Sequence, residues 1–202
     1  MDTNSSVLTD IGTLYVEILS LLKSCGHPAV LNMLDELPTG PGQMTHLQAA
    51  SMPVLSCLPA VSRNVSPQTR PAMQALHRVA DHLRWNQTYT DNDVSADFLQ
   101  NYAWGVVASP EGPVKIDAPQ IALLVLGPHM VYPPHRHGPE EAYYVIGGGG
   151  EITIEDGNWE PLHPQSVVYN PPWQIHGIRT ADDPIIMISL FQATMVPKST
   201  FS

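Results

Sequence analysis

Two histidines and a glutamate lie close together in the stretch PPHRHGPEEAYYVIGGGG, which begins at Pro133. His135 and His137 are separated by one residue, and Glu141 follows four residues after the second histidine. On an extended strand, residues i and i+2 point to the same side, so the two imidazoles share a face. Imidazole binds Zn, Cu, Fe and Ni, and a carboxylate extends this range to Mn. The pattern therefore predicts a site for one divalent metal ion, with Fe2+, Zn2+ and Mn2+ as candidates.

A fourth ligand must come from another part of the chain, and three histidines compete for this place. His176 is the preferred candidate because it follows the proline turn NPPWQ at the expected start of a strand. His163 stands in an expected loop between a leucine and a proline. His129 lies on the stretch that leads into the motif, and we expect it near the metal, where it contacts either a metal ligand or the substrate. The predicted ligand set is His135, His137, Glu141 and His176.

Two tyrosines occupy positions where a phenol could act beside the metal. Tyr143 is two residues beyond Glu141, so it projects on the ligand's side of the strand. Tyr144 points the opposite way and should pack in the core. Tyr132 lies three residues before the first histidine of the motif. A tyrosine pair in a strand is also an ordinary packing feature, because aromatic residues favour strands. The neighbouring ligands make a chemical role the preferred interpretation.

The elements that must position these groups differ between the two halves of the chain. The first half contains apolar residues at helical spacing, as in VLTDIGTLYVEILSLLKSCG and PAMQALHRVADHLRW. In the second half, short apolar runs alternate with glycine and proline turns, which is typical of a β-sandwich or small barrel. We therefore predict a mainly β fold. Residues 1–100 form an α-helical N-terminal extension that packs on the barrel, and residues 101–202 form the barrel with the metal site.

The composition argues against several classes of partner. The 202 residues carry a formal net charge of −10, with nine Lys and Arg and no basic run, which argues against binding nucleic acid through its phosphates. The N-terminus lacks the charged and apolar segments of a signal peptide, and we expect no window that approaches a membrane span. These features predict a cytoplasmic protein, a monomer or homodimer, that acts on a small molecule.

The sequence HRHGPEEAYYVIGG resembles the first motif of the cupin family, in which His135, His137, Glu141 and Gly148 hold their places. The resemblance implies a cupin β-barrel, also described as a double-stranded β-helix or jelly roll, over about residues 101–196.

The second cupin motif is degenerate in this sequence. Pro171 and His176 keep their places. Trp173 stands where a glycine is usual, and Thr180 stands where an asparagine is common. The second motif therefore depends mainly on one histidine.

Within the cupins, the sequence resembles the dimethylsulfoniopropionate (DMSP) lyases and is most similar to the DddQ type. The supporting features are the total length, the helical first half, and the positions of Tyr143 and Tyr132 relative to the ligands. The resemblance implies β-elimination of DMSP to dimethyl sulfide and acrylate. In that reaction the metal binds the substrate carboxylate, Tyr143 is the general base, and Tyr132 orients the substrate or serves as the alternative base.

The implied substrate is a zwitterion with a sulfonium cation, which aromatic faces attract. We expect Tyr132, His129 and Trp173 to bind this substrate. Trp173 is included because it lies three residues before His176. A cupin barrel does not by itself fix the reaction. Two alternatives therefore stay open: a cupin-type Fe-dependent dioxygenase and a non-catalytic metal-binding sensor.

Overall fold

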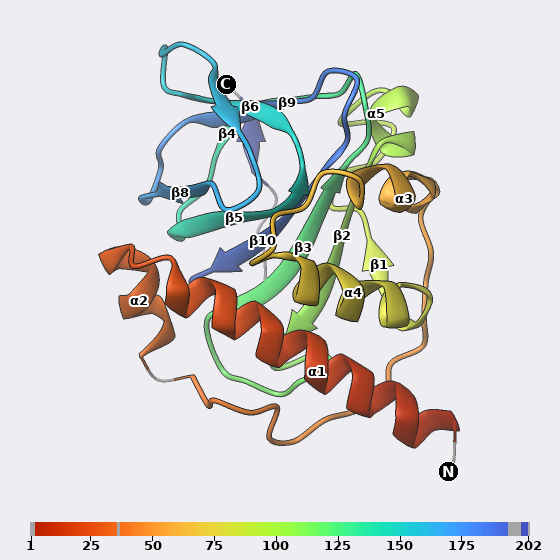
Figure 1. Ribbon diagram of the computed structural model, residues 1–202. Helices are drawn as coiled ribbons and strands as arrows, with labels where there is room; N and C mark the ends of the chain where they lie inside the picture. The colour runs from red at the N-terminus through yellow and green to blue at the C-terminus, as the bar shows by residue number, and fades with distance from the viewer. Residues whose placement is uncertain (1–2, 36, 194–198, 202) are drawn as a thin grey trace.

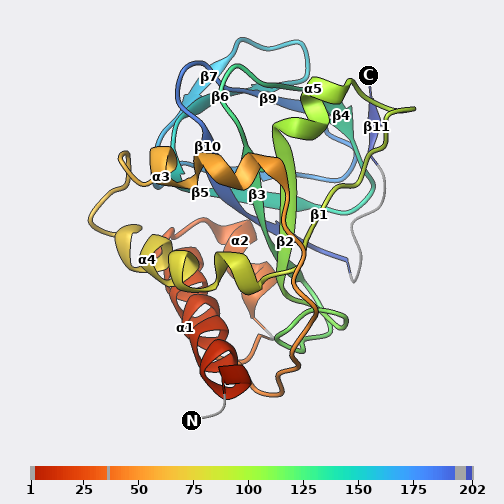
Figure 2. The ribbon, with the colours of Figure 1, turned by 90° about the vertical axis from the view of Figure 1, so that its right-hand side faces the viewer.

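Two antiparallel sheets face each other in the computed structural model, which describes residues 3–35, 37–193 and 199–201 (Figures 1 and 2). The helices are α1 (Thr3–Ser24), α2 (Pro28–Leu34), α3 (Leu58–Val61), α4 (Arg70–Val79) and α5 (Ala96–Gln100), with 3-10 turns η1 (Pro53–Cys57) and η2 (Ala80–His82). The strands are β1 (Trp85–Asn86), β2 (Tyr102–Ala108), β3 (Gln120–Leu126), β4 (Val131–Arg136), β5 (Glu141–Gly148), β6 (Gly150–Ile154), β7 (Glu160–Leu162), β8 (Val167–Asn170), β9 (His176–Arg179), β10 (Ile185–Phe191) and β11 (Thr200–Phe201).

Strand order divides the barrel into a larger and a smaller sheet. The six-stranded sheet has the order β1-β2-β3-β10-β5-β8, and the five-stranded sheet has the order β11-β4-β9-β6-β7. The prediction of a mainly β cupin fold with a helical N-terminal extension is confirmed. Strand β1 lies within residues 1–100 and adds an edge to the larger sheet. The predicted division of the chain at residue 100 stays a prediction.

The six-stranded sheet is buried on both faces because its side chains alternate between two cores. In β5, Ala142, Tyr144 and Ile146 belong to the core shared with the helices. Tyr143 and Val145 belong to the core between the two sheets. The central strands β3 and β10 are likewise buried along their whole length. This alternation separates a helix-packed face from an inner face that is available for a site.

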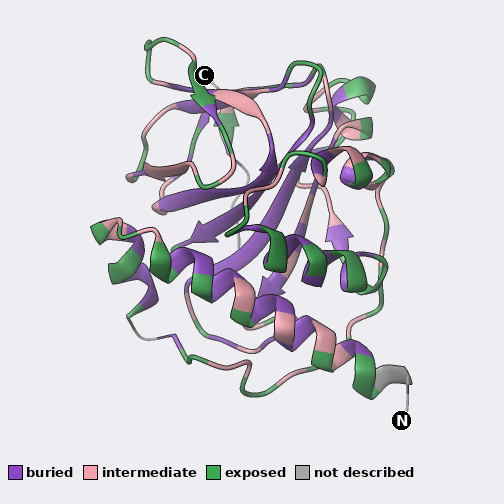
Figure 3. Cartoon of the chain, viewed as in Figure 1, coloured by how far each residue is buried: buried purple, intermediate pink, exposed green. Residues whose placement is uncertain are grey.

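Helix α1 packs with its apolar stripe against α2, α4 and β2 (Figure 1). Buried residues recur at helical spacing along this stripe: Val7, Ile11, Leu14, Tyr15, Ile18 and Leu22. Figure 3 shows buried and exposed positions alternating along the helix. The expectation of no membrane-span window needs correction, because Ser5–Ser24 is long and apolar enough to cross a membrane by length and composition. Half of that window is buried inside the protein, as in a core helix.

The chain passes from one sheet to the other at the glycines that join β5 and β6. Gly148 has a φ of +78°, a conformation that favours glycine. A Cβ at this position would lie 1.8 Å from the carbonyl oxygen of Pro184. Both the backbone conformation and the close approach of a neighbouring strand therefore require glycine here.

We expect Gly148→Ala to lower the free energy of unfolding by about 3 kcal/mol, because it combines left-handed strain with a backbone clash. Gly26→Ala is the matched control, since Gly26 has a φ of +67° but no atom within 4 Å of the added Cβ. It should cost about 1 kcal/mol from strain alone. Urea unfolding of the two variants measures the difference, and equal losses would contradict the steric argument.

Candidate active site

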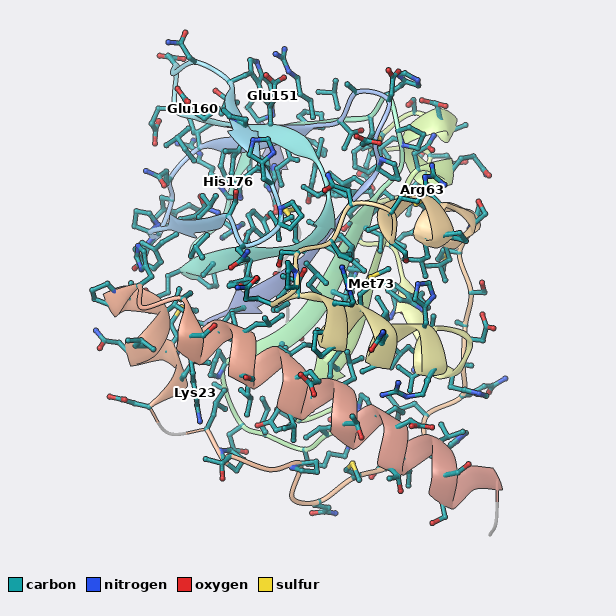
Figure 4. All side chains as sticks on the ribbon, in the orientation of Figure 1. Lys23, Arg63, Met73, Glu151, Glu160 and His176 are labelled. Carbon is teal, nitrogen blue, oxygen red and sulfur yellow. The ribbon has the colours of Figure 1, made fainter. Side chains whose placement is uncertain are left out.

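Three buried imidazoles meet between the two sheets. His135 is on β4, His137 follows β4, and His176 begins β9. Strands β4 and β9 pair so that His135 and His176 are direct cross-strand partners. One ring nitrogen from each of the three histidines lies within 4.8 Å of the others. Figure 4 labels His176 in the part of the molecule formed by the sheets, whereas the labelled Met73 lies on helix α4.

Each imidazole is oriented by a backbone carbonyl only two residues away. The Nδ1 atoms of His135 and His137 lie 2.8 Å from the carbonyl oxygens of Pro133 and Pro139. Nδ1 of His176 lies 3.0 Å from the oxygen of Gln174. Because a carbonyl oxygen can only accept, each Nδ1 must donate its hydrogen. A neutral ring in this tautomer has its lone pair on Nε2, directed into the cluster.

Glu141 completes the cluster from the first position of β5. Its Oε2 atom lies 3.0 Å from Nε2 of His137 and 3.5 Å from Nε2 of His176. Its Oε1 atom accepts a hydrogen bond from Oγ of Ser189 at 2.6 Å. The carboxylate is therefore held in place by a hydroxyl from the neighbouring strand β10.

The donor set fits a divalent cation. Nε2 of His176 is buried and has no hydrogen-bond partner among the described residues. Lone pairs from several imidazoles and a carboxylate converge in one small region, and they repel one another unless a proton or a cation lies among them. Three imidazoles and one carboxylate suit Zn2+, Fe2+ or Mn2+. His135, His137, Glu141 and His176 are the residues that would hold such an ion.

Burial sets the protonation states of the cluster. Burial, reinforced by the nearby His176, lowers the pKa of His135 to about 3. For Glu141, burial acts to raise the pKa, but the neighbouring imidazoles of His137 and His176 outweigh it, so the pKa lies well below its usual value. For His137, burial acts to lower the pKa, but the hydrogen bond to Glu141 raises it overall. Glu141 is therefore ionised and His135 neutral near neutral pH, as metal binding requires.

Two buried tyrosines lie beside this cluster. The Tyr143 ring centroid is 5.9 Å from that of His176. The Tyr132 ring stacks on His135 with centroids 4.2 Å apart and planes 16° apart. Burial is the main reason that the pKa of each phenol lies well above 10, and the charge of Glu141 adds to this effect for Tyr143. A nearby cation would oppose these effects by favouring the phenolate.

A small cavity of about 40 Å³ connects the cluster with the tyrosines. Its polar end contains His135, His137 and Glu141. No lysine or arginine is among its described lining residues. The remaining wall includes six aromatic residues: Tyr89, Tyr102, Trp104, Tyr132, Tyr143 and Phe191.

Three histidine and tryptophan side chains singled out from the sequence lie elsewhere. The side chain of His129 is 71% exposed and lies 3.5 Å from Asp182. Trp173 is 62% exposed, has a φ of +65° and lies over Gly138. His163 is exposed between β7 and β8. None of the three lines the cavity. The expected substrate contacts of His129 and Trp173 stay predictions, although both side chains lie at the surface.

Several lining residues were not predicted as site residues, among them Thr88, Tyr89, Tyr102 and Ser189. Ser189 could have been suspected because it is the one hydroxyl in the apolar strand IIMISLF. Tyr102 is two residues before Trp104 and therefore shares its face of β2. Thr88 and Tyr89 follow β1 in a segment without regular structure, and no sequence pattern points to them.

Fold and site together define a cupin with a candidate metal centre. The chain belongs to the DMSP lyase family, whose family model matches residues 28–187. This match and the similarities to DddQ proteins confirm the resemblance found in the sequence.

Similar proteins support this assignment to different extents. The DMSP lyase DddQ of Ruegeria pomeroyi is 27% identical over 112 residues, which cover 55% of this chain and 56% of that protein. A putative DMSP lyase DddL of Cereibacter sphaeroides is 30% identical over 111 residues, which cover 54% of this chain and 45% of that protein. The chain thus spans about half the length of these curated relatives.

Two crystal structures share the fold over nearly the whole chain. A structure from a study of the DMSP lyases RdDddP and RnDddQII matches with a TM-score of 0.80 and 24% identity, and covers 99% of this chain and 100% of that chain. The structure of DddQ from Ruegeria pomeroyi matches with a TM-score of 0.76 and 22% identity, and covers 96% of each chain. At this identity, the similarity shows the fold.

We expect His176→Ala to lower bound metal from about one ion per chain towards zero, because it removes one of four convergent donors. His163→Ala, at an exposed position, is the matched control and should keep its metal. Elemental analysis of protein purified without added metal measures both. A loss of metal in the His163 variant, with none in the His176 variant, would reverse the assignment of the fourth ligand.

Proposed function

We propose that this protein cleaves DMSP to dimethyl sulfide and acrylate by a metal-dependent β-elimination. The observation that carries the proposal is a cluster of three histidines and one glutamate beside a cavity that tyrosine side chains also line. Membership of the DMSP lyase family agrees with it. The cofactor is one divalent ion, Fe2+, Zn2+ or Mn2+, held by His135, His137, Glu141 and His176.

The substrate has a carboxylate and a dimethylsulfonium group separated by two carbons. In the elimination, a base removes a proton from the carbon next to the carboxylate. The electron pair of that C–H bond forms the C=C bond of acrylate. The C–S bond breaks and its electron pair leaves with sulfur, which becomes neutral dimethyl sulfide. Atoms and charge balance without an oxidant or reductant.

The proton moves to the phenolate oxygen of Tyr143 in this proposal. When bound at the cluster, a divalent cation supplies Lewis acidity to a carboxylate oxygen and favours the ionised form of a nearby phenol. Tyr143 shares the cavity with Glu141 and His135, so a substrate held there lies beside its hydroxyl. Tyr132, which stacks on His135, orients the substrate and is the alternative base.

The aromatic part of the cavity wall suits the sulfonium group. Tyr89, Tyr102 and Trp104 supply ring faces, and each cation–π contact is worth about 0.5–2 kcal/mol. No lysine or arginine among the described lining residues would repel the cation. The buried walls also exclude water, which strengthens the electrostatic interactions inside.

We expect the purified protein to release dimethyl sulfide from DMSP under anaerobic conditions, because the elimination does not use oxygen. Headspace gas chromatography measures the product. Protein treated with a chelator is the control and should release at most a few per cent as much. Oxygen-dependent turnover of another organic substrate would favour the dioxygenase alternative, and inactivity in both assays would favour the sensor.

We expect Tyr143→Phe to keep its metal and to lose at least a hundredfold in kcat, since positioned proton transfer contributes about 10²–10⁴-fold. Tyr144→Phe is a matched control on the same strand, because Tyr144 packs in the helix-side core and does not line the cavity. It should keep kcat within about twofold. Metal loss in the Tyr143 variant would instead make this phenol a ligand or a structural support.

A further inference from the structure

The N-terminal half of the chain contributes two hydroxyl-bearing residues to the cavity. Thr88 and Tyr89 follow strand β1 and lie outside the predicted barrel region, yet both line the cavity. Hydrogen bonds hold residues 87–90 in place beside the cavity. The side-chain amide of Gln87 donates to the carbonyl oxygens of Tyr102, at 2.9 Å, and of Leu99. At the other end, the amide of Thr90 donates to Asp93 at 2.9 Å. The segment is thus a fixed part of the wall.

Tyr89 reaches across the cavity wall to Tyr132. The two hydroxyl oxygens are 2.8 Å apart, and both side chains are buried. The ring of Tyr89 is held by Phe201, with centroids 5.0 Å apart, and by Phe98 in an edge contact at 5.7 Å. A buried phenol confined in this way presents its oxygen in a nearly fixed place.

Tyr132 in turn touches the candidate metal ligands. Its ring stacks on His135 and also contacts the rings of Tyr102 and Phe98, so several contacts set the position of the Tyr132 phenol. The stack fixes the plane of the ring, and the bond to Tyr89 fixes the hydroxyl. Either hydroxyl can donate in that bond. When Tyr89 donates, the hydrogen of Tyr132 is available to an acceptor in the cavity.

We propose that Tyr89 is a positioning residue that holds the Tyr132 hydroxyl towards the substrate, so that Tyr132 donates to the substrate carboxylate. This inference rests on the proposed function, since it assigns the carboxylate to the polar end of the cavity. Tyr89 itself need not touch the reacting atoms. Tyr89 affects the reaction only through the hydroxyl of Tyr132. A purely structural aromatic residue would not show this dependence on Tyr132.

A double-mutant cycle tests this dependence, with Tyr89→Phe, Tyr132→Phe and the double variant measured for kcat and KM on DMSP. Loss of one hydrogen bond predicts a fall of about five- to tenfold in kcat/KM for Tyr89→Phe. Tyr132→Phe should lose at least as much. The double variant should equal Tyr132→Phe, because Tyr89 has nothing left to position. Single losses that multiply in the double variant would overturn the proposal.

Tyr15→Phe is the matched control for a lost tyrosine hydroxyl. Tyr15 is buried in α1, and its hydroxyl donates to the carbonyl oxygen of Pro38 at 3.0 Å, away from the cavity. It should change kcat/KM by less than twofold. Tyr89→Phe should keep the bound metal and should shift the thermal midpoint no more than Tyr15→Phe does. A loss of metal or a much larger shift would mean that Tyr89 supports the fold instead.

Binding of the product acrylate is a second measurement of the role of Tyr89, and it does not depend on turnover. The dissociation constant of acrylate for the metal-loaded proteins, measured by calorimetry, should rise about five- to tenfold in Tyr89→Phe and show the same coupling to Tyr132. If the wild-type protein binds acrylate but does not cleave DMSP, the proposed function fails while the cycle still decides the role of Tyr89. Unchanged acrylate affinity in Tyr89→Phe would contradict that role.

Discussion

The hydrogen bonds from the three imidazoles to backbone carbonyls are the constraint on which the candidate site depends. Pro133, Pro139 and Gln174 each supply an oxygen to a histidine two residues away. These bonds fix the tautomer and leave each Nε2 directed at its neighbours and at Glu141. Such a cluster of acceptors is stable in a buried place only with a proton or a cation among them, so the local backbone already favours metal binding.

The six-stranded sheet places a cavity beside this local arrangement. Its strands alternate between a helix-packed face and an inner face, so Tyr144 packs against the helices while Tyr143 lines the cavity. The helices bury the outer face and thereby allow central strands with hardly any polar residues. The polar groups of the cluster are buried, which strengthens their mutual interactions.

The helical half is more than a cover for the barrel. Strand β1 extends the larger sheet, and residues 87–90 enter the wall of the cavity next to it. The aromatic end of the cavity is therefore built from both halves of the chain. The histidines come from the second half of the chain, whereas Thr88 and Tyr89 come from the first.

The sequence by itself determined the features that depend on neighbours along the chain. The HxH spacing with Glu141, the opposite directions of Tyr143 and Tyr144, and the helical stripe of α1 all follow from the fixed periods of strands and helices. The pairing of His135 with His176, the bond between Tyr89 and Tyr132, and the surface positions of His129 and Trp173 were decided by the tertiary structure. Strand order and turn conformation decide which distant residues meet and which side chains face solvent. The spacing of residues along the chain does not determine either of them.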